Sequence, residues 1–514
     1  MKLRNGTKTL LLNQLKTVGN VALLVALFGS LSFNSRAQEY LQIGNDIDGQ
    51  MTSEASGLAT SLSANGQRIA VGSNFMGNNG LSPGLVRVYE WSNGSWLQLG
   101  VDIVGENMDD EFGTSVSLSQ DGSRVAIGAP ENDDAADRAG MVRVYEFSAG
   151  NWSQVGQDID GITINEGFGG ALSISDNGER IVVGSPSGQT NGQFSGTAKV
   201  YQFDGSSWMQ LGDALGNPMQ GDGFGRSVSM NENGSRVAVG APINDDVVFN
   251  NGKVEIFEWD NSTWNLMGNS ILGDIESGAS GGSIDLNADG TKIVIGADAC
   301  GAAETQGTAK VYEFTGGNWV QLGSQISGTN PISCFADSVA INDEGNRIVI
   351  GDPAQGPNGL TRVFELESNT WNQVGDDILG EAQGDLSGRS VTMSADGARI
   401  AMGANVNSDG APGGGQVRVF EDQSLSVFQD GAQELTVIVW PNPASEIIQI
   451  DNQQNISWQS AQLFDLEGRL ILKKTLSENN RSASMAIDEV AAGLYHLVVL
   501  GEGVSVVKKI IIQN

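Results

Sequence analysis

Apolar residues alternate with small or polar ones in short runs that recur along most of the chain at intervals of about 56 residues. Alternation with a period of two is typical of β-strands, because successive side chains point to opposite faces of the sheet. One such run consists of a basic residue, aliphatic residues and a closing glycine, and it follows a turn that ends in glycine. Its seven copies begin at Arg68, Arg124, Arg180, Arg236, Lys292, Arg347 and Arg399. We therefore expect seven copies of one sheet.

Each repeat contains three further runs that predict strands. One precedes the turn, as in Ser115–Ser119, and another begins at Val86, Val142, Ala198, Val254, Ala309, Thr361 and Val417. The last has the form aromatic-x-Gln-x-Gly and occurs at Trp96, Trp152, Trp208, Trp264 (with Leu266 in place of Gln), Trp319 and Trp371. Turns such as Asp121-Gly122 suit tight two-residue hairpins. Each repeat thus predicts a sheet of four strands.

The final repeat lacks a convincing copy of the aromatic run, since Phe428–Gly431 is at most a remnant. A matching copy, Tyr40–Gly44, stands before the first repeat. We expect it to complete the last sheet, because a ring closed in this way leaves no exposed strand edge. The predicted fold is all-β: a seven-bladed β-propeller over residues 38–422, closed by the N-terminal strand, then a linker over 423–435 and a small C-terminal β-sandwich.

Two repeats carry a paired motif, Phe112-Gly113 with Gly128-Ala129-Pro130 and Phe224-Gly225 with Gly240-Ala241-Pro242. These residues resemble the FG-GAP repeats of integrin α-type propellers, and the resemblance extends over residues 40–421. It implies a seven-bladed ring whose long loops on one face bind ligands.

The same resemblance implies calcium in loops of the form D-x-[DN]-x-D-G-x-x-D between the first two strands of some blades. Only Asp285, Asn287 and Asp289, followed by Gly290, match the start of that pattern, and its ninth position is Ile293. Calcium prefers carboxylate and carbonyl oxygens. We expect either a calcium site at these three residues or an ordinary hairpin turn; no other cofactor is expected.

The repeat stops near residue 435, and residues 436–514 contain short predicted strands compatible with a small β-sandwich. Four pieces occur there in order: Pro441, Asn442 and Pro443; Gly468; Gly493 and Tyr495; Lys508 and Lys509. They resemble the type A C-terminal sorting domain of the type IX secretion system. That resemblance implies the secretion machinery as a partner, passage across the outer membrane and removal of the tail. The alternative is a structural accessory domain.

Residues 1–37 read as a signal peptide. Basic residues precede an apolar run of 13 residues, Val21–Phe33, and Ser35-Arg36-Ala37 offers small residues to a signal peptidase. A spanning helix needs about 20 apolar residues, so an uncleaved anchor is the weaker alternative. We expect a mature chain without a transmembrane segment, which reaches the surface or the medium through the periplasm.

The chain has 61 acidic and 28 basic side chains and a net charge of −33. Residues 1–37 contain five basic residues and no acidic ones, so the mature charge becomes −33 − 5 = −38. Such a charge repels phosphate backbones, which argues against nucleic acid as a partner. We expect a soluble monomer.

Histidine and cysteine usage limits the possible chemistry. His496, the single histidine, lies in the tail, which excludes Ser-His-Asp and Cys-His catalysis in the propeller. Cys300 and Cys334 fall in loops on the same face of neighbouring blades. An oxidising periplasm would allow a disulfide between them, provided that their Cα atoms lie within roughly 7 Å.

The leading functional hypothesis is a non-enzymatic binding or adhesion module for a glycan or protein ligand. Its binding face would include the segments Asn132–Asp134 and Asn244–Asp246. One alternative is a polysaccharide-active enzyme that uses two carboxylates, with candidates among Asp109–Glu111, Asp133–Asp134 and Asp245–Asp246. A structural surface-layer protein is the other. The repeated tryptophans are expected to pack between strands rather than to bind sugars.

Overall fold

The computed structural model describes residues 40–74, 83–189, 192–216, 218–300, 306–330 and 333–423 of the repeat region, and 437–440, 444–452, 458–464, 470–476, 482–488, 490–501 and 504–513 of the tail. The predicted signal peptide and nearly all of the predicted linker lie outside these ranges. Contacts divide the chain into two compact units, one holding nearly all described residues up to 423 and the other residues 425–514. Within the described ranges the secondary structure is entirely β, and none of it is a helix that could span a bilayer.

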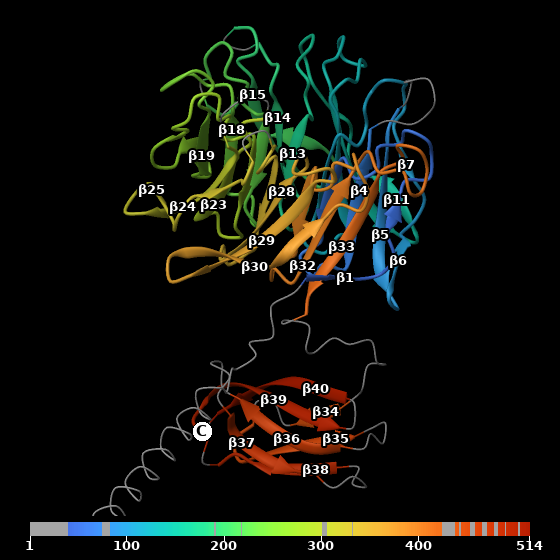
Figure 1. Ribbon diagram of the computed structural model, residues 1–514, viewed down its shortest axis with the longest axis vertical. Coiled ribbons are helices and arrows are strands. Elements are labelled where there is room, and N and C mark those ends of the chain that lie inside the picture. The colour runs from blue at the N-terminus through green and yellow to red at the C-terminus, as the bar shows by residue number, and fades with distance from the viewer. Residues whose placement is uncertain are drawn as a thin grey trace, which may run out of the picture. The chain divides into compact units, whose positions relative to one another are not determined.

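The first unit contains seven antiparallel sheets (Figure 1). In sheets 1 to 6, four consecutive strands of one repeat form the main part of each sheet. Sheet 1 contains β3 (Ala59–Leu62), β4 (Arg68–Ser73), β5 (Leu85–Ser92), β6 (Ser95–Gln98) and β7 (Ile103–Val104). Sheet 2 contains β8 (Ser115–Leu118), β9 (Arg124–Ala129), β10 (Met141–Ser148), β11 (Asn151–Gln154) and β12 (Ile159–Asp160). Sheet 3 contains β13 (Ala171–Ile174), β14 (Arg180–Ser185), β15 (Thr197–Phe203) and β16 (Trp208–Gln210).

The remaining sheets repeat this plan. Sheet 4 contains β17 (Ser227–Met230), β18 (Arg236–Ala241), β19 (Lys253–Trp259), β20 (Trp264–Leu266) and β21 (Ile271–Leu272). Sheet 5 contains β22 (Ser283–Leu286), β23 (Lys292–Ala297), β24 (Thr308–Thr315), β25 (Asn318–Gln321) and β26 (Ile326–Ser327). Sheet 6 contains β27 (Ser338–Ile341), β28 (Arg347–Asp352), β29 (Leu360–Glu367) and β30 (Thr370–Leu379). Sheet 7 contains β31 (Ser390–Met393), β32 (Arg399–Ala404), β33 (Gln416–Asp422), β1 (Tyr40–Gln42) and β2 (Ile47–Asp48).

Sheet 7 joins the two ends of the first unit. β1 pairs antiparallel with β33, with Tyr40 opposite Asp422 and Gln42 opposite Phe420. The Tyr40 hydroxyl donates to the Gly397 carbonyl at 2.6 Å, and Arg347 of sheet 6 bonds Asp422 at 2.7 Å. β1 thus occupies the outer position that the fourth strand of each other repeat fills.

Consecutive sheets face each other closely, and each such contact is called a seam. The first strands touch in the order β3, β8, β13, β17, β22, β27 and β31, and β31 also touches β3. A close backbone approach explains the glycine at the end of the second-strand motif: a Cβ atom on Gly240 would lie 2.1 Å from the Gly281 carbonyl oxygen of the next sheet. The same obstruction occurs from Gly403 to the Gly57 carbonyl, at 2.0 Å, between sheets 7 and 1.

The end of the sheets that carries the tight turns, here the hairpin end, is fastened by the basic residue that opens each second strand. Each basic side chain donates to a carbonyl in the turn of the next sheet. The donor and acceptor residues are Arg68 and Gly122, Arg124 and Gly178, Arg180 and Gly234, Arg236 and Asp289, Lys292 and Glu344, Arg347 and Gly397, and Arg399 and Gly66. The recurring Arg or Lys is therefore a bond between sheets.

The first strands are also linked through their small polar side chains. The Ser117 hydroxyl accepts the backbone N–H of Ile174 at 3.2 Å, and Ser229 accepts that of Leu286 at 2.9 Å. Asp285 takes the same role in sheet 5, where one of its oxygens accepts the N–H of Ile341 at 2.9 Å. These serines are hydrogen-bonding partners of the neighbouring sheet, and not merely small residues that leave room for it.

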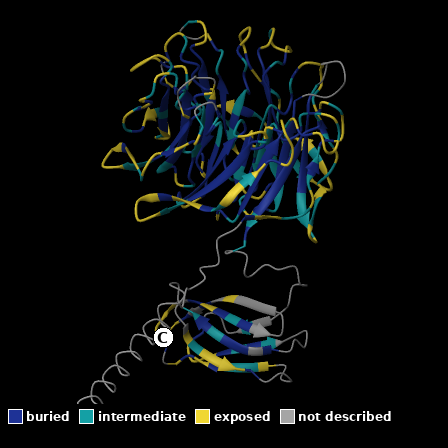
Figure 2. Cartoon of the chain, in the orientation of Figure 1, coloured by how far each residue is buried: buried dark blue, intermediate teal, exposed yellow. Residues whose placement is uncertain are grey.

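The tryptophans of the fourth strands fasten the outer rim. Each of the six indole N–H groups donates to a backbone carbonyl of the preceding repeat, and the acceptor of Trp96 is Ile43, next to β1. Trp208, Trp319 and Trp371 are buried. The rings are thus part of the core, where Figure 2 shows burial concentrated in the strands.

The second unit has two antiparallel sheets. One contains β34 (Val437–Trp440), β35 (Ile447–Asn452) and β38 (Ser482–Ala486); the other contains β36 (Trp458–Phe464), β37 (Leu470–Thr475), β39 (Gly493–Gly501) and β40 (Val504–Ile512). Ile448 and Ile450 of the first sheet and Leu463, Leu497 and Ile510 of the second belong to one buried cluster. A single apolar core therefore holds the tail together.

Candidate ligand-binding site at the loop end

The other end of the seven sheets, here the loop end, carries two loops per sheet. The leading loop precedes the first strand, and the middle loop joins the second and third strands. Those of sheets 2 to 4 rise at the top of Figure 1. Both segments singled out in the sequence, Asn132–Asp134 and Asn244–Asp246, lie in middle loops.

A buried carboxylate anchors most of the leading loops. Asp110 of sheet 2 accepts the Asn107 N–H at 3.1 Å within its loop, and it accepts the side-chain amide of Asn132 from the middle loop, also at 3.1 Å. Burial raises the pKa of Asp110. Sheets 4 and 7 repeat the pair with Asp222 and Asn244 and with Asp385 and Asn407. Asn132 thus joins the two loops of its own sheet.

Sheets 1 and 3 use a glutamate and a cation in this position. Glu54, fully buried, forms an ion pair with Arg87. Glu166 accepts the N–H groups of Ile162 and Thr163 and pairs with Lys199 at 3.2 Å. Burial would raise the pKa of Glu166, but the two N–H groups and the Lys199 ammonium together lower it below its ordinary value.

Sheet 6 exchanges the positions of the acid and the serine. Ser333 stands where sheet 3 has Glu166, and Asp352 stands where it has Ser185. Asp352 is fully buried, and neither of its oxygens accepts a hydrogen bond from any described group. The neighbouring Ser333 hydroxyl donates its one proton to the Asn330 carbonyl at 2.9 Å. Burial raises the pKa of Asp352 to about 6.

Backbone hydrogen bonds join the leading loop of one sheet to the middle loop of the preceding sheet. Between sheets 2 and 3, the Asn165 and Gly167 N–H groups donate to the Asp137 and Arg138 carbonyls at 2.9 and 3.3 Å. Equivalent pairs join Gly221 to Gln193, Gly223 to Phe194, Ser277 to Phe249, Ala279 to Asn250, Ser53 to Pro412 and Ala55 to Gly413. We call this framework the collar; it fixes the backbone of the loop end.

One collar position requires a left-handed backbone. Two residues before the glycine that precedes the third strand, Arg138, Phe194, Asn250 and Gly413 have φ values of +52°, +56°, +48° and +61°. Asn and Gly adopt this conformation readily, whereas a bulky residue there is strained by about 1–2 kcal/mol. Strain of this kind clusters at functional sites. Arg138 and Phe194 hold this conformation although neither is Asn or Gly, as Glu111 and Leu386 do in leading loops.

Arg138 and Phe194 line the same open cleft of about 320 Å³, between the loops of sheets 2 and 3. The other lining residues are Glu131, Asn165, Gly167, Ser187, Gln189 and Gln193. Arg138 forms an ion pair with Glu131, which raises the pKa of the guanidinium. The Phe194 side chain is 57% exposed. The cleft thus combines one aromatic ring, one neutralised ion pair and several neutral hydrogen-bonding groups.

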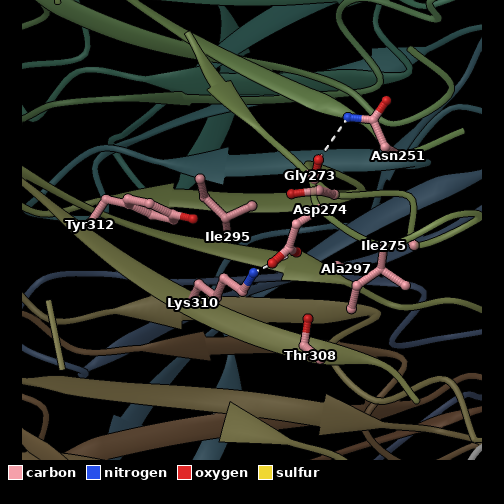
Figure 3. A pocket seen from close by; sticks show the side chains of 11 residues that line it. Asn251, Gly273, Asp274, Ile275, Ile295, Ala297, Thr308, Lys310 and Tyr312 are labelled. Carbon is pink, nitrogen blue, oxygen red and sulfur yellow. Dashed lines mark hydrogen bonds and ion pairs between the residues drawn. The ribbon is translucent and has the colours of Figure 1, made fainter. Parts of the chain in front are cut away.

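A second hollow, between sheets 4 and 5, is too small to hold a ligand (Figure 3). It lies where Ser280 replaces the buried phenylalanine of sheets 2, 3, 4 and 6, and it is lined by Asn251, Thr308 and Tyr312. Asp274 and Lys310 pair across it at 2.7 Å. Its volume of about 10 Å³ admits at most one water molecule.

The structure joins Cys300 to Cys334 as a disulfide, with Cα atoms 4.8 Å apart. The bond connects the middle loop of sheet 5 to the leading loop of sheet 6. In other seams, collar bonds join the corresponding two loops. Asp298 and Asp337 lie beside Cys300, and together they are the one group of three potential metal-ligating side chains among the described residues. Because the Cys300 sulfur is bonded to Cys334 and Asp337 pairs with Arg389, this group is poorly suited to a metal.

The predicted calcium residues are placed near one turn but accept hydrogen bonds from different groups. Asp285 accepts the hydroxyl of Ser229 and an N–H of sheet 6, Asn287 accepts the N–H of Lys292, and Asp289 accepts the N–H and hydroxyl of Thr291. Burial raises the pKa of Asp285 to about 6. Calcium at these residues stays a prediction.

Several residues of the sorting motif can be placed in the tail. Gly493 opens β39, the buried Tyr495 donates its hydroxyl to the Ala491 carbonyl at 2.9 Å, and Lys508 is exposed on β40. In the backbone register of β39 and β40, Lys509 lies opposite His496. Pro441, Asn442, Pro443 and Gly468 lie outside the described residues.

Comparison with known proteins identifies the tail and one of the repeats. Residues 438–513 match the secretion system C-terminal sorting domain, and residues 106–145 match the FG-GAP repeat. The chain therefore contains an FG-GAP repeat, the one around Phe112-Gly113, and a type IX sorting domain. No curated protein matches the chain.

The solved structures that match the chain share little sequence with it. The structure of U3-55K is 11% identical over 75% of this chain and 99% of that one, with a TM-score of 0.47. A candidate 6-phosphogluconolactonase from Bacteroides fragilis is 12% identical over 82% and 98%, with a TM-score of 0.46. Raptor from Chaetomium thermophilum is 9% identical over 75% and 29%, with a TM-score of 0.48.

The cleft residues were not identified from the sequence. The Asn-Asp-Asp segments are acidic, yet the side chains of Asn132 and Asp133 bond other groups of the same sheet: Asn132 donates to Asp110, and Asp133 accepts the Arg138 N–H at 2.6 Å. Aligning the repeats on the glycine before the third strand would have found the cleft, because Arg138 and Phe194 fall where the last repeat has Gly413.

Proposed function

We propose that the chain is a non-enzymatic binding module that acts outside the cell, with its ligand held at the loop end. The type IX sorting tail implies export to the cell surface or the medium. An FG-GAP repeat is consistent with a propeller on that surface.

We further propose that sheets 1 to 7 are the blades of a closed seven-bladed β-propeller. Its support is the pairing of β1 with β33 and the bonds from Arg399 to Gly66 and from Ala395 to Ala64 between sheets 7 and 1. Closure removes the exposed edges that would otherwise invite aggregation. It also makes the loop end a single surface.

The observation that carries the binding hypothesis is the collar. It holds exposed side chains on a fixed backbone, so little ordering free energy is lost when a ligand binds. Exposed apolar residues also occur in the loops of sheets 2 to 4: Met108, Ile162, Ile164, Phe194, Met219, Ile243, Val247 and Phe249. Such residues commonly mark interaction sites.

A binding screen tests the proposal. The mature protein is applied to immobilised polysaccharides and extracellular proteins, with and without EDTA. Saturable binding that Phe194→Gly weakens is expected, and a loss with EDTA would show that calcium takes part. Absence of saturable binding to every probe would favour the structural surface-layer alternative.

We favour binding over hydrolysis because the described residues that line the cleft include one carboxylate, that of Glu131, and this group is paired with Arg138. Glycoside hydrolysis commonly uses two carboxyl groups. Release of reducing ends from any polysaccharide, abolished by Glu131→Gln, would reverse this preference.

Export is tested by mass spectrometry of the culture medium and the cell surface. We expect a chain that begins near residue 38 and lacks residues beyond about 435. An extracellular chain with the tail attached would contradict its removal. A chain that stays inside the cell would contradict the localisation.

A further inference from the structure

We infer that the cleft between sheets 2 and 3 is a subsite for a neutral glycan, with Phe194 as the surface on which a sugar ring stacks. The inference rests on the proposed binding function and names its ligand class. It starts from the residues that line the cleft, whose volume of about 320 Å³ far exceeds the 10 Å³ of the hollow in Figure 3.

The lining matches a ligand that is rich in hydroxyl groups. The side-chain amides of Asn165, Gln189 and Gln193 each offer both donors and an acceptor, as sugar hydroxyls do. Phe194 presents an aromatic ring to solvent, and the C–H face of a pyranose packs on such a ring. A volume of about 320 Å³ is at the small end for ligand sites, which suits a short stretch of a longer chain.

Electrostatics disfavours an anionic ligand. The Arg138 guanidinium is neutralised by Glu131, and the chain without its predicted signal peptide carries a charge of −33 − 5 = −38, which repels anions. A peptide ligand typically uses an exposed strand edge or a pocket for an apolar anchor. Its described lining residues show neither feature: Phe194 is the one large apolar side chain among them, and it is 57% exposed.

Backbone geometry allows the side chains of Phe194 and Arg138 to be removed without loss of the collar bonds. Both hold the left-handed position that Asn250 and Gly413 occupy in sheets 4 and 7. The bonds at this position are made by the backbone: the Phe194 carbonyl accepts the Gly223 N–H at 3.0 Å, and the Arg138 carbonyl accepts the Gly167 N–H. A glycine would keep these bonds and remove the strain, so the fold does not require either side chain.

This geometry separates binding from stability in an experiment. Phe194→Gly and Arg138→Gly should melt at or above the wild-type temperature while they weaken binding. Asn250→Gly, at the same position in sheet 4, is the matched control and should leave binding unchanged. Phe194→Tyr keeps the ring and should restore binding, which separates loss of the aromatic surface from added loop flexibility.

The probes are xylan, mannan and β-glucan as neutral glycans, polygalacturonate as an acidic one, and an array of random peptides. We expect the full mature protein to bind at least one neutral glycan, with dissociation constants at least tenfold higher for Phe194→Gly and Arg138→Gly. Undiminished glycan binding by these variants, or binding to polygalacturonate or peptides alone, would overturn the cleft assignment and leave the loop end as a binding surface. Failure of every probe to bind would overturn both.

Discussion

The hairpin end and the loop end are built from the same repeat, and bonds between sheets fasten both. At the hairpin end the bonds use side chains: a basic residue opens each second strand and donates to the turn of the next sheet, in all seven seams. At the loop end the collar uses backbone groups, as between Asn165 and Asp137 or Ala279 and Asn250. A side-chain bond fixes the residue type, whereas a backbone bond does not.

This difference explains why the residue types vary more at the loop end than at the hairpin end. The hairpin end keeps Arg or Lys in every repeat because a bond is lost with the residue. The loop end tolerates Arg138, Phe194, Asn250 and Gly413 at one position, since only their backbone groups are needed. Variable side chains on a fixed frame are what a binding surface requires. The buried acids beneath the loops, such as Glu54 and Asp110, fix that frame from within.

The largest expected effect comes from removing such an anchor. Glu54→Ala leaves Arg87 buried without its closest partner, so the free energy of unfolding should fall by about 3–5 kcal/mol. At the hairpin end, Arg236 and Glu258 pair at 2.8 Å but are partly exposed. Glu258→Ala should cost less than about 1 kcal/mol. Urea unfolding of both variants measures the difference; equal losses would contradict the distinct roles of the two kinds of pair.

The next largest effect concerns the disulfide between sheets 5 and 6, which lies where other seams have collar bonds. Replacing Cys300 and Cys334 by serine should lower the stability of the oxidised protein by about 2–4 kcal/mol, because the bond closes a segment with a sequence separation of 34. Thermal or urea unfolding with and without reductant measures it. The double variant should match the reduced wild type. Two reactive thiols in the denatured, unreduced protein would show that the bond is not formed.

A smaller effect depends on pH. The pKa of Asp352, raised to about 6 by burial, exceeds that of the unfolded chain, near 4. The stability contributed by the protonated form is therefore fully present below about pH 4 and lost as the pH rises through about 6, by on the order of 2–3 kcal/mol. The variant Asp352→Ala carries the residue that sheet 2 has at the equivalent position, Ala129. It should flatten the pH dependence of the unfolding free energy. An unchanged pH profile of the unfolding free energy would contradict it.

The repeat unit, its four strands and the hairpin turns were predictable because strand alternation and Asp-Gly or Asn-Gly turns are local signals. The segment Tyr40–Gly44 could be assigned to the last sheet by counting aromatic runs. The tail was recognisable from short motifs such as Gly493 and Tyr495. Each of these signals lies within a few residues of sequence.

The cleft could not be predicted in the same way. Its lining comes from the middle loops of sheets 2 and 3 and the leading loop of sheet 3, which are apart in sequence and joined by collar bonds that leave no residue-type signature. The acid anchors were missed for a similar reason: Asp110 finds its partner, Asn132, across two loops. In sheet 6 the buried acid is Asp352 at the end of the second strand and the leading loop carries Ser333, so the acid does not keep one position in every repeat.

Hydrogen exchange of the collar amides tests the central claim most directly. The N–H groups of Asn165, Gly167, Ser277 and Ala279 lie in loops, but they donate to the neighbouring sheet. We predict that peptides covering them exchange as slowly as those of the flanking strands, and far more slowly than the exposed hairpin tips around Gly94 and Gly150. Collar peptides that exchange as fast as those tips would contradict a fixed loop end, and with it the account of where the ligand binds.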